Sequence, residues 1–173
     1  MTSAPVVELL QLPATVIASL AEGDLTAANL GSPVPLTEWH VSPGPRRTWT
    51  YRRTQLATQP ADADWITRVI WDPSLGRSVG QAGFHGPPDA RGMVEMGYAV
   101  DPEYRRRGYA RAAVVDLLAR ARREPSVRVL RATVSPGNVA SEHLTAAFGL
   151  VRVGEQWDEE DGLEIVYELG VDA

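Results

Sequence analysis

The sequence predicts an α+β fold with a parallel β-loop-α-β unit at its centre and hairpins on either side. Residues 93–100 alternate apolar with small or polar side chains, as a half-buried strand does. Residues 113–121 repeat apolar side chains at helical spacing, and residues 127–134 again resemble a strand. Because a helix joins these two strands, we expect them to lie parallel and adjacent in one sheet.

The N-terminal part is predicted to be mainly helical. Residues 6–10 favour a short edge strand, and residues 14–21 and 25–30 favour helices. Gly23 and Asp24 between them are typical of a helix stop and a new N-cap. Residues 31–45 contain four prolines and predict an irregular connection, after which a helix runs from Arg46 to Pro60.

Two hairpins complete the predicted sheet. Residues 65–71 and 78–84 form the first, and the loop 86–92 leads from it into the central strand. A helix is expected over residues 138–148, followed by strands 151–157 and 163–169. The acidic turn 158–161 joins this last pair. It is either a solvated tip or a negative rim that steers a cationic amine.

Composition limits the classes of function. The 173 residues suffice for one domain, and the absence of cysteine excludes disulfides and thiolate metal sites. A formal charge of −5 argues against a dedicated nucleic-acid binder. Residues 1–12 lack the features of a signal peptide, and no apolar stretch has the length of a membrane helix. We therefore expect a soluble cytoplasmic protein without a membrane partner.

A glycine-bearing turn among arginines begins the central helix at residues 105–110. The first N–H groups of a helix have no partner within it and lie at the positive end of the dipole. Gly108 and Ala110 are small, which would let a phosphate approach the backbone. This turn predicts an anion site.

The residues of this turn resemble a known family. Arg105-x-x-Gly108-x-Ala110 is similar to the pyrophosphate loop of the GCN5-related N-acetyltransferases, the GNAT superfamily. The strand Glu95-Met96-Gly97-Tyr98 resembles that of the ribosomal-protein N-terminal acetyltransferases. The resemblance covers about residues 65–169. Other segments in the family's order are Asp101-Pro102-Glu103-Tyr104, Asn138-x-x-Ser141-x-x-Leu144 and Phe148-Gly149-Leu150.

The resemblance implies a mixed, mostly antiparallel sheet of about six to seven strands with helices on both faces. Residues 1–173 would form a single domain, in which helices at about 13–60 wall the acceptor site and about 65–169 bind acetyl-CoA. Main-chain groups of Ala99 and Val100 would hold the thioester, and Asn138 would contact the pantetheine arm. No metal is implied. The residues implied for the pyrophosphate are Arg105, Arg106, Arg107, Gly108, Tyr109 and Ala110.

Two residues are candidates for catalysis. Glu95 shares its strand face with the small Gly97 and Ala99, which would leave room for a substrate or water beside a general base. The alternative is a structural charge. Thr145 stands where relatives carry a tyrosine that protonates the thiolate, so Ser141 is the candidate donor, or else an ordinary first-turn serine.

These residues predict transfer of an acetyl group from acetyl-CoA to a primary amine, by direct attack in a ternary complex. The amine would be a protein N-terminus or a small molecule. One alternative is a non-catalytic acyl-CoA-binding or sensing domain, because the tyrosine is missing. Another is an RNA-associated module on the basic and aromatic residues 46–53, although we expect an amphipathic helix with solvated arginines there.

Three points stay open in the sequence. The 3′-phosphate of the cofactor has Arg106, Arg111 or Arg131 as candidate partners, and a homodimer is neither indicated nor excluded. Gly76-Arg77-Ser78-Val79-Gly80 matches the nucleophile elbow of hydrolases, but the required strand-turn-helix context is missing. Ser78 is therefore predicted to be inert.

Overall fold

The computed structural model describes residues 4–171, so the ends of the predicted 1–173 domain lie outside it. Within this range the protein is α+β, with five α-helices and seven strands that hydrogen-bond in the order β1-β2-β3-β4-β5-β7-β6. The predicted fold class is confirmed. The chain divides into two compact units, 1–83 with 98–116 and 84–97 with 117–173.

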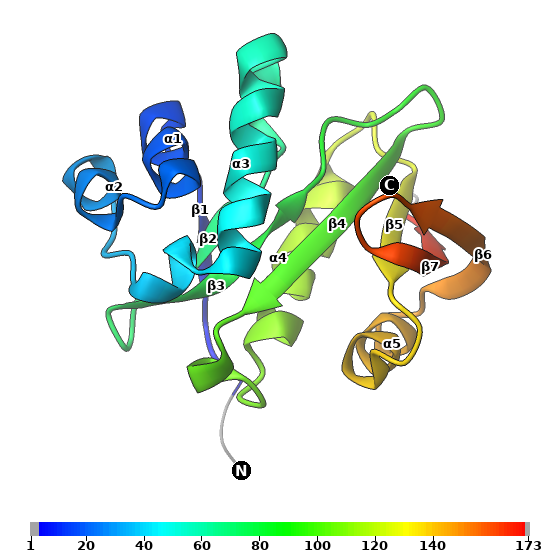
Figure 1. Ribbon diagram of the computed structural model, residues 1–173. Helices are drawn as coiled ribbons and strands as arrows, with labels where there is room; N and C mark the ends of the chain where they lie inside the picture. Colours follow the sequence, from blue (N-terminus) through cyan, green and yellow to red (C-terminus); the bar gives the residue numbers. More distant parts are fainter. Residues whose placement is uncertain (1–3, 172–173) are drawn as a thin grey trace. The chain divides into compact units, whose positions relative to one another are not determined.

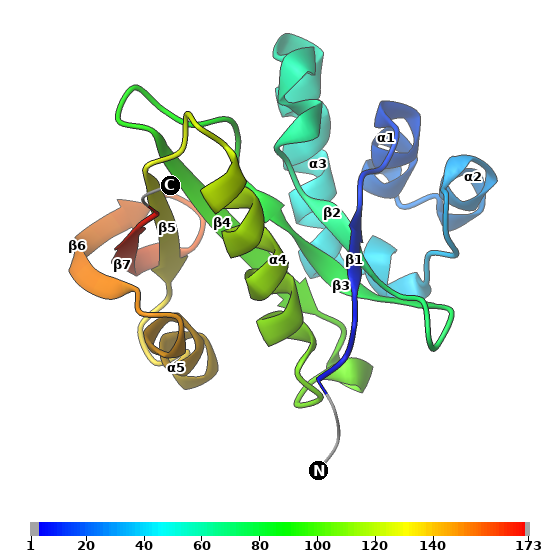
Figure 2. The same cartoon turned by 180° about the vertical axis from the view of Figure 1, so that it is seen from behind.

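The first unit contains the N-terminal helices and the first strands. The strands β1 (Glu8–Leu10), β2 (Arg68–Asp72) and β3 (Arg77–Phe84) pair antiparallel in sequence order. The helices are α1 (Ala14–Glu22), α2 (Leu25–Gly31), α3 (Pro43–Thr58) and the first turns of α4 (Tyr109–Arg123). Two opposite views show α3 on one side of β2 and β3 and the start of α4 on the other (Figures 1 and 2).

The predicted helix boundaries in this unit follow from local chemistry. Gly23 has φ 81° at the end of α1, and the Asp24 side chain accepts a hydrogen bond from the Ala27 N–H at the start of α2. The helix predicted from Arg46 instead begins at Pro43, because proline is well accommodated in a first turn. A short 3₁₀ helix, Glu38–Val41, interrupts the connection predicted to be irregular.

The arginines of α3 are not simply solvated, so that part of the expectation is wrong. Arg52 is buried and donates from Nε to the Thr67 hydroxyl and from Nη1 to the Gln55 amide oxygen. Arg46 donates to the Ala21 and Glu22 carbonyls. Through these hydrogen bonds Arg52 holds α3 to Thr67, and Arg46 holds it to the end of α1.

The second unit contains the parallel pair. The first part of β4 (Met93–Val100) runs parallel to β5 (Val129–Val134), with Val94 opposite Leu130, as the β-loop-α-β prediction requires. The hairpin of β6 (Val151–Asp158) and β7 (Gly162–Gly170) continues the sheet from β5.

Further 3₁₀ helices lie at Pro60–Asp64 and Pro102–Tyr104 in the first unit.

The helix α5 (Val139–Ala147) belongs to the second unit and lies inside the predicted range 138–148. Its first residue, the apolar Val139, is 54% exposed, whereas the polar Thr145 is buried.

No helix among the described residues is both long and apolar enough to span a membrane.

Candidate functional site

The loop between β4 and α4 has the backbone of an anion site. Arg106 has φ 60° and Gly108 has φ 89°, so two left-handed residues are separated by a single residue. The Gly108 carbonyl accepts the first helical hydrogen bond, from the Ala112 N–H at 2.9 Å. Left-handed residues in a turn direct successive N–H groups into one concavity, and the helix start adds its own N–H groups. The observed backbone of this loop is therefore compatible with the predicted anion site.

The side chains around this loop fix its position within the first unit. Arg105 Nε donates to the Val100 carbonyl at 3.0 Å and so ties the loop to the end of β4. The Arg107 guanidinium lies 5.5 Å from the centroid of the Tyr104 ring, which in turn contacts Tyr109 edge to face.

Tyr109, the first residue of α4, is anchored to the end of β2. Its hydroxyl donates to Asp72 Oδ2 at 2.7 Å, and both side chains are buried. Burial and the Asp72 carboxylate raise the pKa of Tyr109 to about 12. Burial alone would raise the pKa of Asp72, but hydrogen bonds from Ser74, Tyr109 and the Leu75 N–H outweigh it and lower that pKa. Only the backbone N–H of Tyr109 is left to meet a phosphate.

Gly108 is required for a reason different from the predicted one. A β-carbon there would stand 3.1 Å from Pro5 Cδ, so it would meet the N-terminal segment of the chain. The left-handed φ of 89° also disfavours any other residue. The glycine thus permits the turn and the approach of Pro5.

The two predicted main-chain contacts of β4 are not equivalent. The Ala99 carbonyl oxygen lies on the β3 side, 2.4 Å from where a β-carbon on Gly80 would stand. Successive residues of a strand direct their N–H and C=O groups to opposite edges, so Val100 faces the other way. The Val100 carbonyl accepts from Arg105, which leaves its N–H as the candidate partner for a ligand.

Glu95 lies in the second unit, in a cluster that also contains a histidine. The Thr133 hydroxyl donates to Glu95 Oε1 at 2.8 Å, and His85 Nδ1 lies 3.5 Å from the same oxygen. The His85 N–H also donates to the Glu95 carbonyl at 2.8 Å, so the two residues are cross-strand neighbours. The Glu95 side chain is 17% exposed and that of His85 is 47% exposed.

The expectation of open space over Gly97 is wrong. His85 Nε2 lies 2.8 Å from the point where a β-carbon of Gly97 would stand, so the imidazole covers this glycine. The sequence interpretation did not include His85. A signal was present, because His85 is a polar residue directly after the buried strand 77–84, facing the next strand across a hairpin loop.

The other candidates in this unit have structural partners as well. Arg131, proposed for the 3′-phosphate, donates from Nε and Nη2 to Glu168 Oε1 at 3.0 and 2.6 Å. Asn138 caps α5, since its Oδ1 accepts from the Ser141 N–H at 3.3 Å. The Thr145 hydroxyl donates to the Glu142 carbonyl within the helix.

The structure thus brings Ala99, Val100 and the loop 105–110 together in the first unit. It brings Glu95 together with Thr133 and His85 in the second, where Asn138 and Ser141 also lie at the start of α5.

The hydrolase-like motif has no reactive geometry. Ser78 lies within β3, is fully buried and donates to the Pro35 carbonyl at 2.5 Å. A strand continues after it where an elbow would require a helix.

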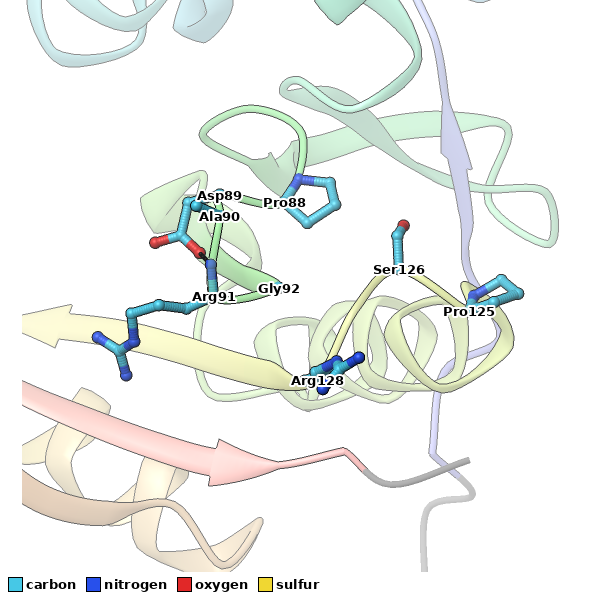
Figure 3. A pocket seen from close by; sticks show the side chains of 8 residues that line it. All are labelled: Pro88, Asp89, Ala90, Arg91, Gly92, Pro125, Ser126 and Arg128. Atoms are coloured by element: carbon cyan, nitrogen blue, oxygen red, sulfur yellow. Dashed lines mark hydrogen bonds between the residues drawn. The ribbon is translucent and has the colours of Figure 1, made fainter.

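An open hollow of about 430 Å³ lies in the second unit, at the N-terminal ends of β4 and β5. Figure 3 shows Arg91 extending away from Ser126, and its guanidinium lies 3.7 Å from Glu168. None of the predicted site residues lines this hollow, which is formed by residues 88–92, 125, 126 and 128.

Comparison with known proteins gives a match over most of the chain. A model of the acetyltransferase (GNAT) domain matches residues 17–151. YjdG of Bacillus subtilis (strain 168), an uncharacterized N-acetyltransferase, is 33% identical over 73 residues. This match covers 42% of the present chain and 44% of YjdG, so it spans less than half of that relative.

Solved structures share the fold at low identity. The acetyltransferase yncA from Salmonella typhimurium, with its cofactor acetyl-CoA, has a TM-score of 0.60 at 17% identity over 99% of this chain and 96% of its own. The ribosomal-protein-S5-alanine acetyltransferase from Vibrio fischeri has a TM-score of 0.61 at 19% identity, over 96% and 92%.

Proposed function

Because the chain belongs to the acetyltransferase (GNAT) family, we propose that it transfers the acetyl group of acetyl-CoA to a primary amine. The amine attacks the thioester directly in a ternary complex, and residues 1–173 act as a single N-acetyltransferase domain. The observation that carries the proposal is the loop 105–108, whose two left-handed residues precede α4 among three exposed arginines.

The pyrophosphate is assigned to this loop. The N–H groups of residues 106–110 supply hydrogen-bond donors. The exposed side chains of Arg106 and Arg107 supply positive charge within the same turn. The Val100 N–H is assigned to the thioester carbonyl, where it would stabilise the developing oxyanion. Asn138 is assigned to the pantetheine arm through its amide NH₂, because its Oδ1 caps α5.

The reaction also needs proton transfers. The acceptor enters as an ammonium ion and must lose a proton before its nitrogen can attack. Glu95 supplies the negative charge for this step, and Ser141 passes a proton to the departing thiolate. The acceptor is a protein N-terminus or a small-molecule amine. The Vibrio fischeri protein, named for ribosomal protein S5 alanine, supports including an N-terminal peptide among the candidates.

Acetyl-CoA binding is the first test, measured by calorimetry. Gly108→Glu forces a side chain onto a left-handed residue and against Pro5, which distorts the turn, and it adds a negative charge to the loop, so we expect affinity to fall at least about tenfold. Gly76→Glu is the matched control, since Gly76 is also left-handed, at φ 62°, with open space around it. Circular dichroism checks that both variants fold. Wild-type protein that binds no acetyl-CoA would refute the proposal.

Turnover is the second test. Release of free CoA is followed with an N-terminal alanyl peptide, a polyamine, an aminoglycoside and an amino acid, each with acetyl-CoA. Acetylation of one of them is expected. Tight binding without turnover of any amine would instead favour the acyl-CoA-sensing alternative. RNA binding serves as the counter-assay for the basic helix α3.

A further inference from the structure

We infer that His85 is the residue that takes the proton from the acceptor ammonium, and that Glu95 and Thr133 are positioning residues for its imidazole. The inference rests on the proposed acetyl transfer and assigns a role to a histidine that sequence patterns did not single out.

The backbone and the side chains hold His85 beside β4. The hydrogen bond from the His85 N–H to the Glu95 carbonyl fixes the two residues opposite one another. Their side chains then lie on the same face, with Nδ1 and Oε1 at 3.5 Å. Thr133, from β5, donates to the same oxygen and so fixes the position of the carboxylate.

This arrangement selects one tautomer of the imidazole. Nδ1 faces a carboxylate and so carries the proton, which leaves a lone pair on Nε2. Nε2 lies over Gly97, on the face of β4 that also carries Glu95. The basic nitrogen is therefore held over β4 and not turned away from it.

Accessibility favours the imidazole over the carboxylate as the group that meets the substrate. Nearly half of the His85 side chain is exposed, compared with 17% of Glu95, whose Oε1 already accepts from Thr133. An imidazole also has an ordinary pKa near 6.5, closer to neutral working conditions than the value near 4.3 of a glutamic acid.

The surrounding charges leave Glu95 available to His85. Arg131 on β5 gives two hydrogen bonds to Glu168, and Arg91, in the turn before β4, lies 3.7 Å from the other oxygen of that carboxylate. Both arginines thus interact with the Glu168 carboxylate and not with that of Glu95 in these contacts. The Glu95 charge therefore stabilises an imidazolium at His85.

The steps balance without any further reactant. Nε2 takes one proton from the ammonium, and the freed lone pair forms the C–N bond to the thioester carbon. Collapse of the tetrahedral intermediate breaks the C–S bond, and the sulfur keeps the electron pair. The Ser141 hydroxyl passes to the thiolate the proton that the new amide nitrogen loses, and His85 releases its own proton to water.

The experiment measures kcat, kcat/KM and acetyl-CoA affinity against pH for the best amine found. His85→Gln is expected to lower kcat and kcat/KM by about 10² to 10⁴ and to remove the acidic limb of the profile, with acetyl-CoA affinity unchanged. Glu95→Gln should keep the limb but move it to lower pH. The double variant should cost no more than His85→Gln alone. His143→Gln, at an exposed histidine of α5, is the control.

Two results separate the possible failures. In the first, His85→Gln keeps both turnover and the acidic limb of the pH profile, and Glu95→Gln loses that limb. This result would assign the base to Glu95 and overturn this inference alone. No acetylation of any amine by the wild-type protein would overturn the proposed function and, with it, this role. Carbon-nitrogen correlation NMR of the three histidines adds a direct check, because a neutral His85 protonated on Nε2 would contradict the geometry.

Discussion

Tyr109→Phe removes one hydroxyl at the start of α4 and tests how the loop 105–110 is anchored. The tyrosine hydroxyl donates to Asp72 Oδ2 at 2.7 Å, whereas Ser74 and the Leu75 N–H donate to Oδ1. Phenylalanine keeps the ring that contacts Tyr104. The substitution therefore removes a buried hydrogen bond and leaves the packing in place.

The expected cost is about 2 kcal/mol of unfolding free energy. Asp72 is 3% exposed, so water does not readily replace the lost donor. A hydrogen bond to a charged group contributes about 1.5–3 kcal/mol, and a buried acceptor left without a donor costs about 1–3 kcal/mol. In a domain of this size each kcal/mol lowers Tm by about 2–4 °C, so a decrease of about 4–8 °C is expected.

Urea unfolding at pH 7 measures this cost, with Tyr51→Phe as the control. Tyr51 is 63% exposed, and its ring contact with Arg52 survives the substitution, so its effect should be small. Acetyl-CoA affinity is measured alongside, and a modest weakening is expected because Tyr109 begins the helix that carries the loop.

The pH dependence gives a second readout of the same contact. Hydrogen bonds hold the pKa of Asp72 below its ordinary value, despite burial. Their contribution is therefore present above about pH 4, the ordinary range of an aspartic acid, and is lost as the pH falls through the lower folded-state value. The difference between wild type and Tyr109→Phe should narrow in acid. A difference below about 0.5 kcal/mol at pH 7, or one matched by Tyr51→Phe, would refute the anchoring role.

Three further predictions concern other residues. Gly97→Ala should displace the His85 ring, because the new β-carbon would lie 2.8 Å from Nε2. We therefore expect kcat to fall about tenfold or more while acetyl-CoA affinity stays unchanged, and an unaltered kcat would contradict this. Burial lowers the pKa of His40 to about 4, so unfolding free energy should fall by about 3 kcal/mol in total between pH 6.5 and 4. Urea unfolding of His40→Gln should show a weaker dependence of unfolding free energy on pH, and an equal dependence in both proteins would contradict the role of His40. Neutralising the exposed acids 159–161 together should lower kcat/KM for a cationic amine and leave kcat nearly intact, with an effect that disappears in high salt; a salt-independent loss would exclude steering.

The turn at residues 105–108 and the start of α4 could be predicted because their signals are local. Glycine at the turn, arginines around it and a helical repeat after it all lie within about 20 residues. The same holds for Gly23 and Asp24, whose helix-ending and capping roles depend only on neighbouring backbone groups. Hydrogen bonds over three or four residues follow from the sequence pattern itself.

The reasons given for individual residues were less secure. Gly108 was predicted to make room for a phosphate, yet the space beside it is taken by Pro5, about 100 residues earlier in the chain. The arginines of α3 were expected in solvent, yet Arg52 meets Thr67 across 15 residues. A side chain of mixed character, such as arginine, can face either water or a buried acceptor, and the pattern of its own helix does not decide which.

The sequence by itself determined the order of helices and strands, the parallel centre of the sheet and the place of the glycine-bearing turn before α4. Tertiary structure decided which side chains meet, and therefore that Glu95 shares its carboxylate with Thr133 and His85 and that Tyr109 reaches Asp72 across 37 residues. The physical reason is strand register. A shift of one residue, as at the irregularity between Ile70 and Trp71, moves every later side chain to the other face of the sheet, and periodicity within one strand cannot specify its alignment with the next.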